Sequence, residues 1–461
     1  MSESIGNKGT GMKLHTKILI GLLVGAVLGI ASYATLGVGH PFVAVVNRYV
    51  AGPVGQIFLR LLFMIVVPLV FASIALGVAG LGDIRRVGRV GTKAITYFLV
   101  TTALSATLGL VMVSVVRPGE RIPEDTRTNL METYATDASS RVEAAATSNF
   151  GIETLVNIVP RNPLRAAVDL DLLAIIFFAL IFGAALTLIA AERATPMLGF
   201  LQALNDIVIK IVEMAMKLAP YGVAALIFGV TSRFGWDVVK LLSWYVGTVL
   251  VALVLHVLIN ISAILRFLVG ISPAKFLSRI RGALVTAFST SSSSATLPTA
   301  IATAEMNLGI PRHIAGFVLP LGSTMCMNGT ALFEGITVIT LAQAFGVSLN
   351  FGQMVAVMIM SVLTAVGAAG VPGGSIPLLV GVLAMFGVPA EGIAIILGVD
   401  RILDMSRTTV NVLGDLSATA FVARSEKVWD ASMVPEVEGL DTATERLDDS
   451  PGWPRPIESR E

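Results

Sequence analysis

The sequence is poor in charged residues and contains a single cysteine, Cys326. One cysteine can form neither an intramolecular disulfide nor a cysteine-based metal site. Only 14% of the 461 residues are Asp, Glu, Lys or Arg, against about 25% in ordinary soluble domains. The formal net charge of +1 argues against a broadly basic surface, so no nucleic-acid partner is expected. Residues 18–38 lack a small-residue cleavage site, and we interpret them as a retained span rather than a signal peptide.

Apolar residues fill most of the chain instead, and 55% of all residues are hydrophobic. A stretch of about twenty apolar residues is long enough for a helix to cross a lipid bilayer. Segments of this kind lie at 15–38, 52–81, 91–116, 168–192, 198–232, 237–268, 310–345 and 388–423. The sequence therefore predicts an all-α polytopic membrane protein with about eight transmembrane helices.

Two further apolar segments are interrupted, so that each half is too short to cross alone. Segment 274–304 contains the hydroxyl run 289–294, and segment 352–386 contains the Gly- and Pro-rich run 367–375. Opened backbone at membrane depth is tolerated only where protein or water satisfies its polar groups, so both segments are predicted to be re-entrant hairpins. In the last third of the chain, a predicted hairpin is followed by a span that carries polar residues, and this pair of segments occurs twice. Such an inverted repeat indicates the binding site of a transporter.

Lysine and arginine accumulate on alternate connections, which predicts the orientation in the membrane. The basic residues of the cytoplasmic side are Lys8, Lys13, Arg85, Arg86, Arg89, Lys93, Arg266, Lys275, Arg279, Arg281, Arg424 and Lys427. A multi-pass protein of the cell membrane with both termini in the cytoplasm is therefore expected.

The predicted order of parts follows from these spans. Residues 1–14 form the cytoplasmic N-terminus, 15–116 hold helices 1–3, 117–167 form an extracellular loop, and 168–268 hold helices 4–6. Residues before about 232 are expected to be mainly scaffold. The charged tail 424–461 is predicted to be disordered.

The last span carries five ionisable side chains in an otherwise apolar helix. At 3.6 residues per turn, they share one face with two neutral polar residues, within roughly 60° of Asp404. The members of this face are Asp400, Arg401, Asp404, Arg407, Thr408, Asn411 and Asp415. Because each such charge facing lipid costs about 2.5–3.5 kcal/mol, the face is predicted to line protein or an aqueous cavity. Substrate and ion pathways are the usual setting for intramembrane charge.

Asp404 and Arg407 form the most informative pair on this face. A carboxylate suits a substrate ammonium group, and a guanidinium group binds a carboxylate through two parallel hydrogen bonds. Together they favour a zwitterion or a dianion that carries an amino group. The alternative is a structural ion pair, in which the two residues satisfy each other or Arg401. Arg401 itself is interpreted as the charge partner that keeps Asp404 ionised and oriented.

Glu334 lies in the apolar segment 310–345, where a carboxyl group can act as a proton carrier. A neutral, hydrogen-bonded structural carboxylic acid is an equal alternative. The hydroxyls and freed amides of the first hairpin tip can bind a substrate carboxylate. A serine hydrolase would need a base beside those serines, and the only deeply placed histidine, His256, lies in an aliphatic helix. The chain is therefore not expected to be an enzyme.

Four motifs carry a family resemblance: SSSSATLP (291–298), FVLPLGSTMCMNGTALFEG (317–335), AVGAAGVPGG (365–374) and GVDRILDMSRTTVNVLGD (398–415). In this order they closely resemble the dicarboxylate/amino acid:cation symporter family, the glutamate and aspartate transporters. The resemblance implies a secondary active symporter for a small acidic amino acid, without a cofactor and with H⁺ and/or Na⁺ as coupling ions. It also implies a homotrimer of the elevator type, in which a transport domain slides past a trimerisation scaffold that includes helices 4 and 5.

The resemblance further implies which residues bind substrate. These are Ser292, Ser293, Thr330, Val371, Gly373, Asp404, Arg407, Thr408 and Asn411. Asp404 would hold the amino group and Arg407 the side-chain carboxylate, which favours acidic over neutral substrates. Archaeal relatives carry an arginine where Ser291 stands, and Arg401 is expected to supply that charge.

Cation sites are implied in the same way. One sodium site comprises Gly322, Cys326, Asn411 and Asp415, and a second, mostly of backbone carbonyls, comprises Thr324, Ala365, Val366 and Ala368. A third retains Thr101, Thr102 and Asn328. It is incomplete, because Phe98 replaces the family tyrosine and Asn328 replaces an aspartate, so a hard cation loses oxygen ligands. Glu334 stands where animal members carry a proton-bearing glutamate, which favours proton coupling with a reduced sodium requirement.

Three alternatives stay open. C4-dicarboxylates such as succinate are the main rival substrates, although an ionised Asp404 with no ammonium to meet would repel a dianion. A sodium-only transporter of acidic amino acids is the second. A ligand-gated anion channel or sensor on the same scaffold is the third.

Overall fold

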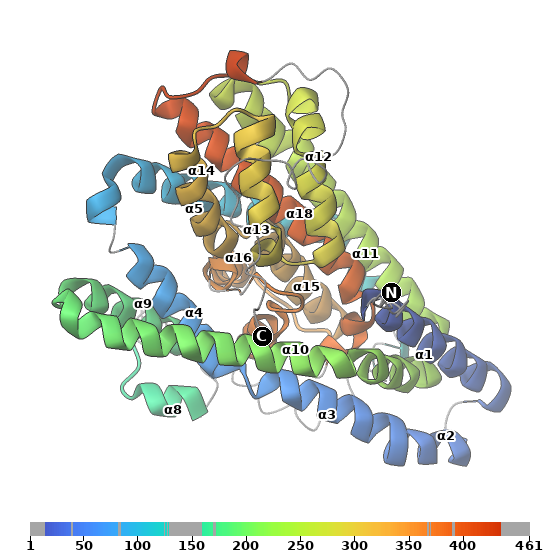
Figure 1. The fold of residues 1–461 in the computed structure, drawn as a ribbon. Helices are drawn as coiled ribbons and strands as arrows, with labels where there is room; N and C mark the ends of the chain where they lie inside the picture. The colour runs from blue at the N-terminus through green and yellow to red at the C-terminus, as the bar shows by residue number, and fades with distance from the viewer. Residues whose placement is uncertain are drawn as a thin grey trace, which may run out of the picture.

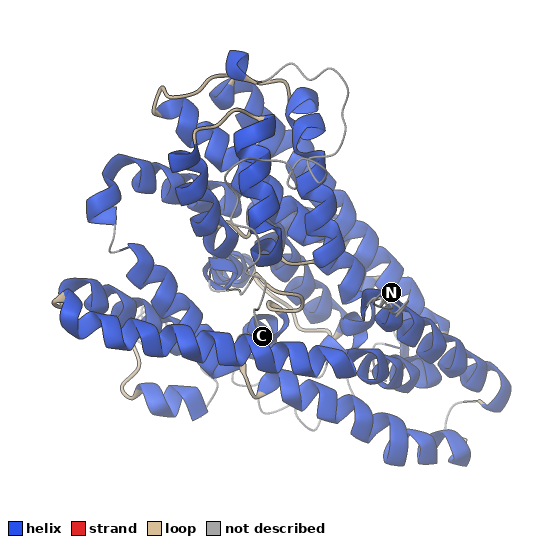
Figure 2. Cartoon of the chain, viewed as in Figure 1, coloured by secondary structure: helices blue, strands red, loops and turns tan. Residues whose placement is uncertain are grey.

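A computed structural model describes residues 14–434, apart from 38–39, 82–83, 124, 127, 129–158, 169–171, 367, 369 and 390–391. Within these residues every regular element is a helix, and no strand is present (Figure 2). The α-helices are α1 (Leu14–Leu36), α2 (Pro41–Val46), α3 (Gly52–Phe63), α4 (Val66–Leu81), α5 (Ile84–Val116), α8 (Pro163–Val168), α9 (Leu172–Leu188), α10 (Ala191–Phe234), α11 (Trp236–Leu255), α12 (Pro273–Thr290), α13 (Ser293–Ala302), α14 (Arg312–Met325), α15 (Asn328–Ala344), α16 (Phe351–Val366), α17 (Ile376–Met385) and α18 (Ile393–Ser425). Short π or 3-10 turns are η1 (Asn47–Ala51), η2 (Pro118–Glu120), η3 (His256–Ile261), η4 (Ile264–Val269), η5 (Thr303–Asn307) and η7 (Ala431–Met433). The prediction of an all-α protein is confirmed.

The helices form two regions, which Figure 1 separates clearly. The 44-residue helix α10 runs along one side of the molecule, α1, α3 and α4 pack against it, and α9 packs on α4. We call these five helices the α10 layer. α5 and the helices from α11 to α18 gather above this layer in the view of Figure 1 and are called the site bundle.

Several helices are long and apolar enough to cross a membrane. Six are found among the described residues: Thr16–Leu36, Pro41–Leu61, Arg89–Glu120, Ala191–Phe234, Trp236–Val269 and Arg312–Ala344. The predicted span 52–81 is interrupted at 64–65, between α3 and α4, and the span 310–345 is interrupted at 326–327, between α14 and α15. A polytopic membrane protein is supported, whereas the exact number of spans stays a prediction.

A row of glycines spaced four residues apart brings α1 against α10. A β-carbon at Gly21 would overlap the backbone carbonyl group of Pro220, and one at Gly25 would overlap that of Ala224. Gly29, one turn further on, is equally close to α10. Small residues at this spacing let two helices pack with their backbones in contact inside a membrane. α1 and α10 are therefore packed with their backbones in contact.

Both interrupted segments fold as helical hairpins whose tips meet. α12 and α13 are joined by Ser291 and Ser292, with Ser291 in the left-handed region at φ 52°. α16 and α17 are joined by residues 367–375. The hydroxyl of Ser292 donates a 2.6 Å hydrogen bond to the carbonyl of Gly370, which links one tip to the other. Their depth in the membrane stays a prediction.

α5 packs with the site bundle, so the expectation that residues before about 232 are mainly scaffold is too broad. The hydroxyls of Tyr97 and Ser417 lie 2.6 Å apart, joining α5 to α18. The hydroxyl of Ser105 donates to the carbonyl of Asn328 at 2.8 Å, joining α5 to α15. The polar residues along α5 therefore serve contacts within the bundle.

The segment after α18 also differs from the prediction of a tail disordered from Arg424 onward. α18 itself continues to Ser425, and Arg424 donates to the carbonyl of Val269 at 2.7 Å. The indole of Trp429 is buried and donates to the carbonyl of Leu308 at 2.7 Å. Residues 424–434 thus pack on the bundle, because an indole gains burial and a hydrogen-bond partner there. Residues 435–461, most of 117–167 and residues 1–13 lie outside the described residues.

Candidate functional site

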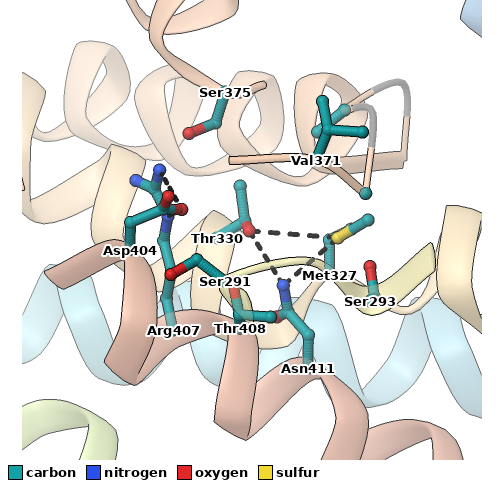
Figure 3. A pocket seen from close by; sticks show the side chains of 12 residues that line it. Ser291, Ser293, Met327, Thr330, Val371, Ser375, Asp404, Arg407, Thr408 and Asn411 are labelled. Atoms are coloured by element: carbon teal, nitrogen blue, oxygen red, sulfur yellow. Dashed lines mark hydrogen bonds and ion pairs between the residues drawn. The ribbon is translucent and has the colours of Figure 1, made fainter. Parts of the chain in front are cut away.

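A small cavity lies where the two hairpin tips meet α18 and the start of α15 (Figure 3). It is lined by Ser291, Ser293, Met327, Thr330, Ala368, Gly370, Val371, Ser375, Asp404, Arg407, Thr408 and Asn411. Its volume is about 20 Å³, a little more than the roughly 10–15 Å³ that one water molecule needs. An amino acid can therefore enter only if one of the tips moves.

The charged face of α18 lines this cavity as a closed network of ion pairs. Arg407 donates from Nε and Nη2 to Oδ1 of Asp404 at 3.1 and 2.8 Å. Arg401 donates from Nη1 to the other carboxylate oxygen of Asp404 at 3.2 Å. Asp400 lies 3.4 Å from Nη1 of Arg407. Two carboxylates and two guanidinium groups thus balance in charge, which is how buried charges are tolerated.

This network bears on the alternative that Asp404 and Arg407 satisfy each other. They do so in the structure, and Arg401 contacts Asp404 as expected of its charge partner. A ligand carboxylate that takes both Nε and Nη2 of Arg407 must therefore take the place of the Asp404 carboxylate. A solute with a carboxylate for one residue and an ammonium for the other would replace both halves of the pair.

Packing from α15 fixes the position of Arg407. Its guanidinium carbon lies 4.2 Å from the centroid of the Phe333 ring, which gives a cation–π contact. A β-carbon at Gly329 would lie only 2.5 Å from the backbone oxygen of Arg407, so glycine allows α15 and α18 to approach here. The side chain is 2% exposed, and its remaining donor, Nη1, has no hydrogen-bond partner among the described residues.

The amide of Asn411 joins α18 to the start of α15. Its oxygen accepts from the backbone N–H of Gly329 at 2.8 Å, and its nitrogen donates to the hydroxyl of Thr330 at 3.0 Å. Thr408 and Asn411 are both buried and form the floor of the cavity in Figure 3. These contacts hold two of the polar walls in one orientation.

The hairpin tips use some of their polar groups on each other rather than on the cavity. Ser292 does not line it, because its hydroxyl donates to Gly370 and accepts from the N–H of Ala295. Gly373 does not line it either, because its N–H donates to Asp404 at 3.1 Å. Both predicted substrate ligands are thus occupied in contacts that close the site. Ser293 lines the cavity and donates to the carbonyl of Ser323 at 3.2 Å.

The other predicted substrate residues are brought together. Those that line the cavity are Ser293, Thr330, Val371, Asp404, Arg407, Thr408 and Asn411. The lining residues that sequence reasoning left out of its substrate set are Ser291, Met327, Ala368, Gly370 and Ser375. Ser375 carried a signal, since it is the one hydroxyl in the Gly- and Pro-rich run 367–375.

Glu334 lies one helical turn beyond Thr330 and does not line the cavity. It is completely buried, and Thr364 of α16 donates to its Oε2 at 2.5 Å. Its Oε1 has no partner among the described residues. The carboxyl group therefore connects α15 to the second hairpin and has one oxygen free to carry a proton.

Gly322 and Asp415 of the first expected sodium site lie side by side. A β-carbon at Gly322 would be 2.6 Å from Oδ1 of Asp415, and that buried oxygen has no hydrogen-bond partner among the described residues. The N–H of Cys326 donates to the carbonyl of Gly322 at 2.8 Å. An unpaired buried carboxylate oxygen suits a hard cation such as sodium.

The second and third sets are less suited to a cation. The hydroxyl of Thr324 is exposed and donates to Leu321, and the carbonyl of Ala365 already accepts from the N–H of Ala368. Val366, next to Ala365, ends α16 and is half-buried.

In the third set the side-chain oxygen of Asn328 accepts from Thr102 at 2.8 Å and from Thr101 at 3.3 Å. The Thr102 hydroxyl occupies the oxygen that a cation would need, while the Thr101 hydroxyl makes a shorter bond, of 2.8 Å, to the carbonyl of Tyr97. The amide nitrogen of Asn328 has no hydrogen-bond partner among the described residues, and an N–H donor cannot bind a cation.

The sequence as a whole can be compared with known families. Residues 14–425 match the sequence model of the sodium:dicarboxylate symporter family, which covers nearly all of the described chain. The chain belongs to this family.

Individual members of the sodium:dicarboxylate symporter family match over almost their whole length. The chain is 37% identical over 426 residues to a proton/sodium-glutamate symport protein of Bacillus subtilis, covering 92% of this chain and 95% of the relative. It is 34% identical over 424 residues to a proton/glutamate-aspartate symporter of Escherichia coli, with the same two shares. A C4-dicarboxylate transport protein of Bacillus subtilis is 31% identical over 431 residues, 93% of this chain and 98% of the relative. The expected family membership is confirmed.

Proposed function

We propose that this protein is a secondary active symporter that takes up glutamate or aspartate together with cations. The observation that carries the proposal is the buried Asp404–Arg407 pair on the wall of a cavity closed by two hairpin tips. The pair offers one anionic and one cationic partner at a fixed separation, which matches a solute that carries both an ammonium and a carboxylate group. The relatives named for glutamate and aspartate symport support the same substrate class.

Binding follows from the contacts that substrate would replace. The substrate ammonium takes the Asp404 carboxylate, and the substrate side-chain carboxylate takes the guanidinium fork of Arg407. Arg401 stays on Asp404 as its second cationic partner. Thr408 and Asn411 offer polar contacts to the remaining carboxylate. The exchange keeps Asp404 and Arg407 each paired with an opposite charge, which avoids the cost of leaving either of them unpaired.

Access is proposed to open by movement of the second tip. The cavity is too small for an amino acid, and the tip is held by the Gly373 bond to Asp404 and the Ser292 bond to Gly370. An ammonium on Asp404 competes with the Gly373 N–H for the same carboxylate. The tip is thus a gate whose closed position depends on the group that binds substrate.

Larger movements and assembly are proposed on the family resemblance. The site bundle would slide past the α10 layer as an elevator, within a homotrimer in the cell membrane and with both termini in the cytoplasm. Large apolar side chains on α10 support a lipid or subunit contact there, since Phe200, Ile207 and Met214 are exposed within one chain. Cross-linking of the protein in its native membrane would test the trimer.

Coupling is proposed to use protons, with sodium at the site of Gly322 and Asp415. Glu334 supports a proton carrier because it is buried, has one unpaired oxygen and contacts the second hairpin through Thr364. Asn328 argues against a third sodium ion, since its oxygen is occupied by Thr101 and Thr102.

The decisive experiment measures uptake of labelled aspartate and glutamate into proteoliposomes under separately imposed sodium and pH gradients. We expect accumulation above the external concentration that is driven by an inward proton gradient and lost in Glu334→Gln. The exposed glutamate of α10 gives the matched control Glu213→Gln, which should retain this drive. Uptake driven by sodium alone and unaltered in Glu334→Gln would remove the proton claim. Equilibration without accumulation would favour the channel or sensor instead.

C4-dicarboxylate transport is the second candidate, because C4-dicarboxylate transport proteins are among the relatives. Asp404 argues against it, since an ionised carboxylate repels a dianion that has no ammonium group. Competition of succinate against labelled aspartate separates the two. Strong competition, together with unchanged uptake in Asp404→Asn, would favour the dicarboxylate.

A further inference from the structure

A second cavity lies on the exposed side of α11 and shares no residue with the cavity of Asp404 and Arg407. It encloses about 270 Å³ and is lined by Trp236, Val239, Lys240, Ser243 and Trp244. Both tryptophans are exposed, at 58% and 46%. Tryptophan is enriched in membrane proteins at the boundary between the hydrocarbon core and water. The cavity therefore has the lining expected at the level of lipid headgroups.

Two cationic side chains lie at this cavity. The guanidinium carbon of Arg121, which follows η2, lies 3.9 Å from the centroid of the Trp244 ring. Arg121 forms no ion pair within the part of the chain that the structure describes. Lys240 lies 3.3 Å from Asp237, whose other oxygen accepts from Thr126. Two cations thus lie beside one carboxylate, and this net positive charge suits a phosphate group, which accepts charge-assisted hydrogen bonds.

An apolar stripe continues along α11 from this cavity. Trp244 is followed at helical spacing by three exposed residues over roughly 21 Å, at 1.5 Å per residue: Val251, Val254 and Leu258. Gly247 lies between Trp244 and Val251, and a β-carbon there would have no neighbour within 4 Å. The missing side chain leaves a recess on the stripe. An acyl chain that crosses half of the roughly 30 Å hydrocarbon core fits along this length.

The combination of charge and apolar surface decides which occupant fits. A cationic, aromatic end joined to a long apolar stripe matches an anionic phospholipid, whose charged head and acyl chains follow in the same order. Arg121 directly follows the apolar span Arg89–Glu120, which places the cationic end at a boundary of the membrane. The exposed side chains that support a subunit contact lie on α10 instead, so this side of α11 is open to lipid.

We infer that one anionic phospholipid binds to α11, with its phosphate held by Arg121 and Lys240 and one acyl chain lying over Gly247. The site is separate from the proposed transport function and does not depend on it. Trp236 directly follows Gly235, the residue that joins α10 to α11. The lipid therefore also contacts the connection between the α10 layer and the site bundle.

The test measures lipid binding to the delipidated, detergent-purified protein by native mass spectrometry, with the melting temperature as a second readout. The probe is dioleoyl phosphatidylglycerol, and dioleoyl phosphatidylcholine, which has the same chains and no net charge, is the comparison lipid. We expect one phosphatidylglycerol to bind each chain and raise its melting temperature, and phosphatidylcholine to bind about tenfold more weakly.

Two variants separate the headgroup from the acyl chain. In Arg121→Gln/Lys240→Gln the Kd for phosphatidylglycerol should rise about tenfold or more, because the hydrogen bonds to the charged phosphate are lost. Gly247→Leu, which fills the recess, should weaken binding of the lipid while both cations stay in place.

Arg117→Gln/Lys210→Gln is the matched control, because it removes two positive charges away from the cavity. Arg117 pairs with Glu120 just after α5, and Lys210 pairs with Glu213 on α10. Exposed charges at a distance are screened by salt, so the Kd should stay within about twofold of wild type.

Three results would contradict the inference. Equal binding of the two lipids, or an unchanged Kd in Arg121→Gln/Lys240→Gln, would mean that the tryptophans are general interfacial anchors. Glycerol phosphate alone should not raise the melting temperature, and a rise as large as that with the lipid would assign the cavity to a free phosphate ester. A change of oligomeric state in Arg121→Gln/Lys240→Gln with wild-type lipid binding would assign this side of α11 to a subunit contact.

Discussion

The α10 layer and the site bundle differ in whether they hold buried charged side chains. In the α10 layer, α1 meets α10 through Gly21, Gly25 and Gly29, and large apolar side chains point outward. In the site bundle, every described residue of α15 from Asn328 to Ala342 is buried. Among the described side chains, the buried Asp, Glu and Arg groups all lie on α15 or α18. One region thus relies on close backbone packing, and the other pairs charges in its interior.

The difference separates stability from binding. Small residues hold membrane helices together without any group that could recognise a solute. Buried charges cost stability unless they are paired, so charged residues inside a membrane protein usually serve its function. Changes in the α10 layer are therefore expected to alter stability at constant substrate affinity, and changes in the site bundle to alter affinity first.

The largest effect is expected from Arg407→Lys in the site bundle. Lysine keeps the positive charge beside Asp400 and Asp404 but loses the fork that holds a carboxylate through two hydrogen bonds. Hydrogen bonds to charged groups are worth about 1.5–3 kcal/mol, so uptake efficiency (kcat/KM) for aspartate should fall about 10- to 100-fold. Initial rates of uptake into proteoliposomes measure this.

Arg312→Lys provides the control for that substitution. Arg312 begins α14, and its side chain is 85% exposed. It should transport as well as wild type. Retention of full uptake efficiency in Arg407→Lys would mean that Arg407 is only a structural partner of Asp404, the alternative that the ion pair leaves open.

Gly25→Ala in the α10 layer should have the next largest effect, and on stability. The added β-carbon would overlap the carbonyl group of Ala224, so α1 and α10 must move apart. Overpacking of this kind costs about 1–3 kcal/mol, and the melting temperature should fall. KM should be unchanged in the protein that remains folded.

Gly199→Ala, on α10 itself, is the matched control. A β-carbon at Gly199 has no neighbour within 4 Å, so its melting temperature should equal or exceed that of wild type. A loss of substrate affinity in Gly25→Ala at an unchanged melting temperature would contradict the separation of the two regions.

The charged face of α18 could be predicted from the sequence because the period of a helix is fixed by its backbone. Asp404, Arg407 and Asn411 line one cavity, as that period requires. The roles of single hydroxyls could not be predicted. Ser292 is engaged by Gly370, which lies 78 residues away, whereas Ser375 has no hydrogen-bond partner among the described residues.

The glycines that lie at helix contacts could not be predicted from the sequence either. Glycine is frequent throughout the chain, with 44 residues, and no local signal distinguishes Gly25 from Gly199. Only the position of α10 makes one close to a backbone and the other open. Sequence periodicity predicts which residues share a helix face, whereas the partner of that face depends on segments about two hundred residues away.

The smallest expected effect is that of Glu426→Gln on the melting temperature. Glu426 follows the last residue of α18. Arg89 donates to its carboxylate at 2.6 Å and Lys93 at 2.7 Å. These hydrogen bonds hold the pKa of Glu426 below its ordinary value, and the bond from Arg89 has the largest effect. A carboxylate with a lowered folded-state pKa stabilises the protein above its unfolded pKa of about 4.3, and this contribution is lost as pH falls through the folded pKa. Glu426→Gln should therefore have a slightly lower melting temperature than wild type at pH 7, and this difference should disappear in acid.

Glu213→Gln, at an exposed pair on α10, should change the melting temperature less at pH 7. A gap that is absent at pH 7, or that widens in acid, would mean that the contact between α5 and the end of α18 does not stabilise the bundle.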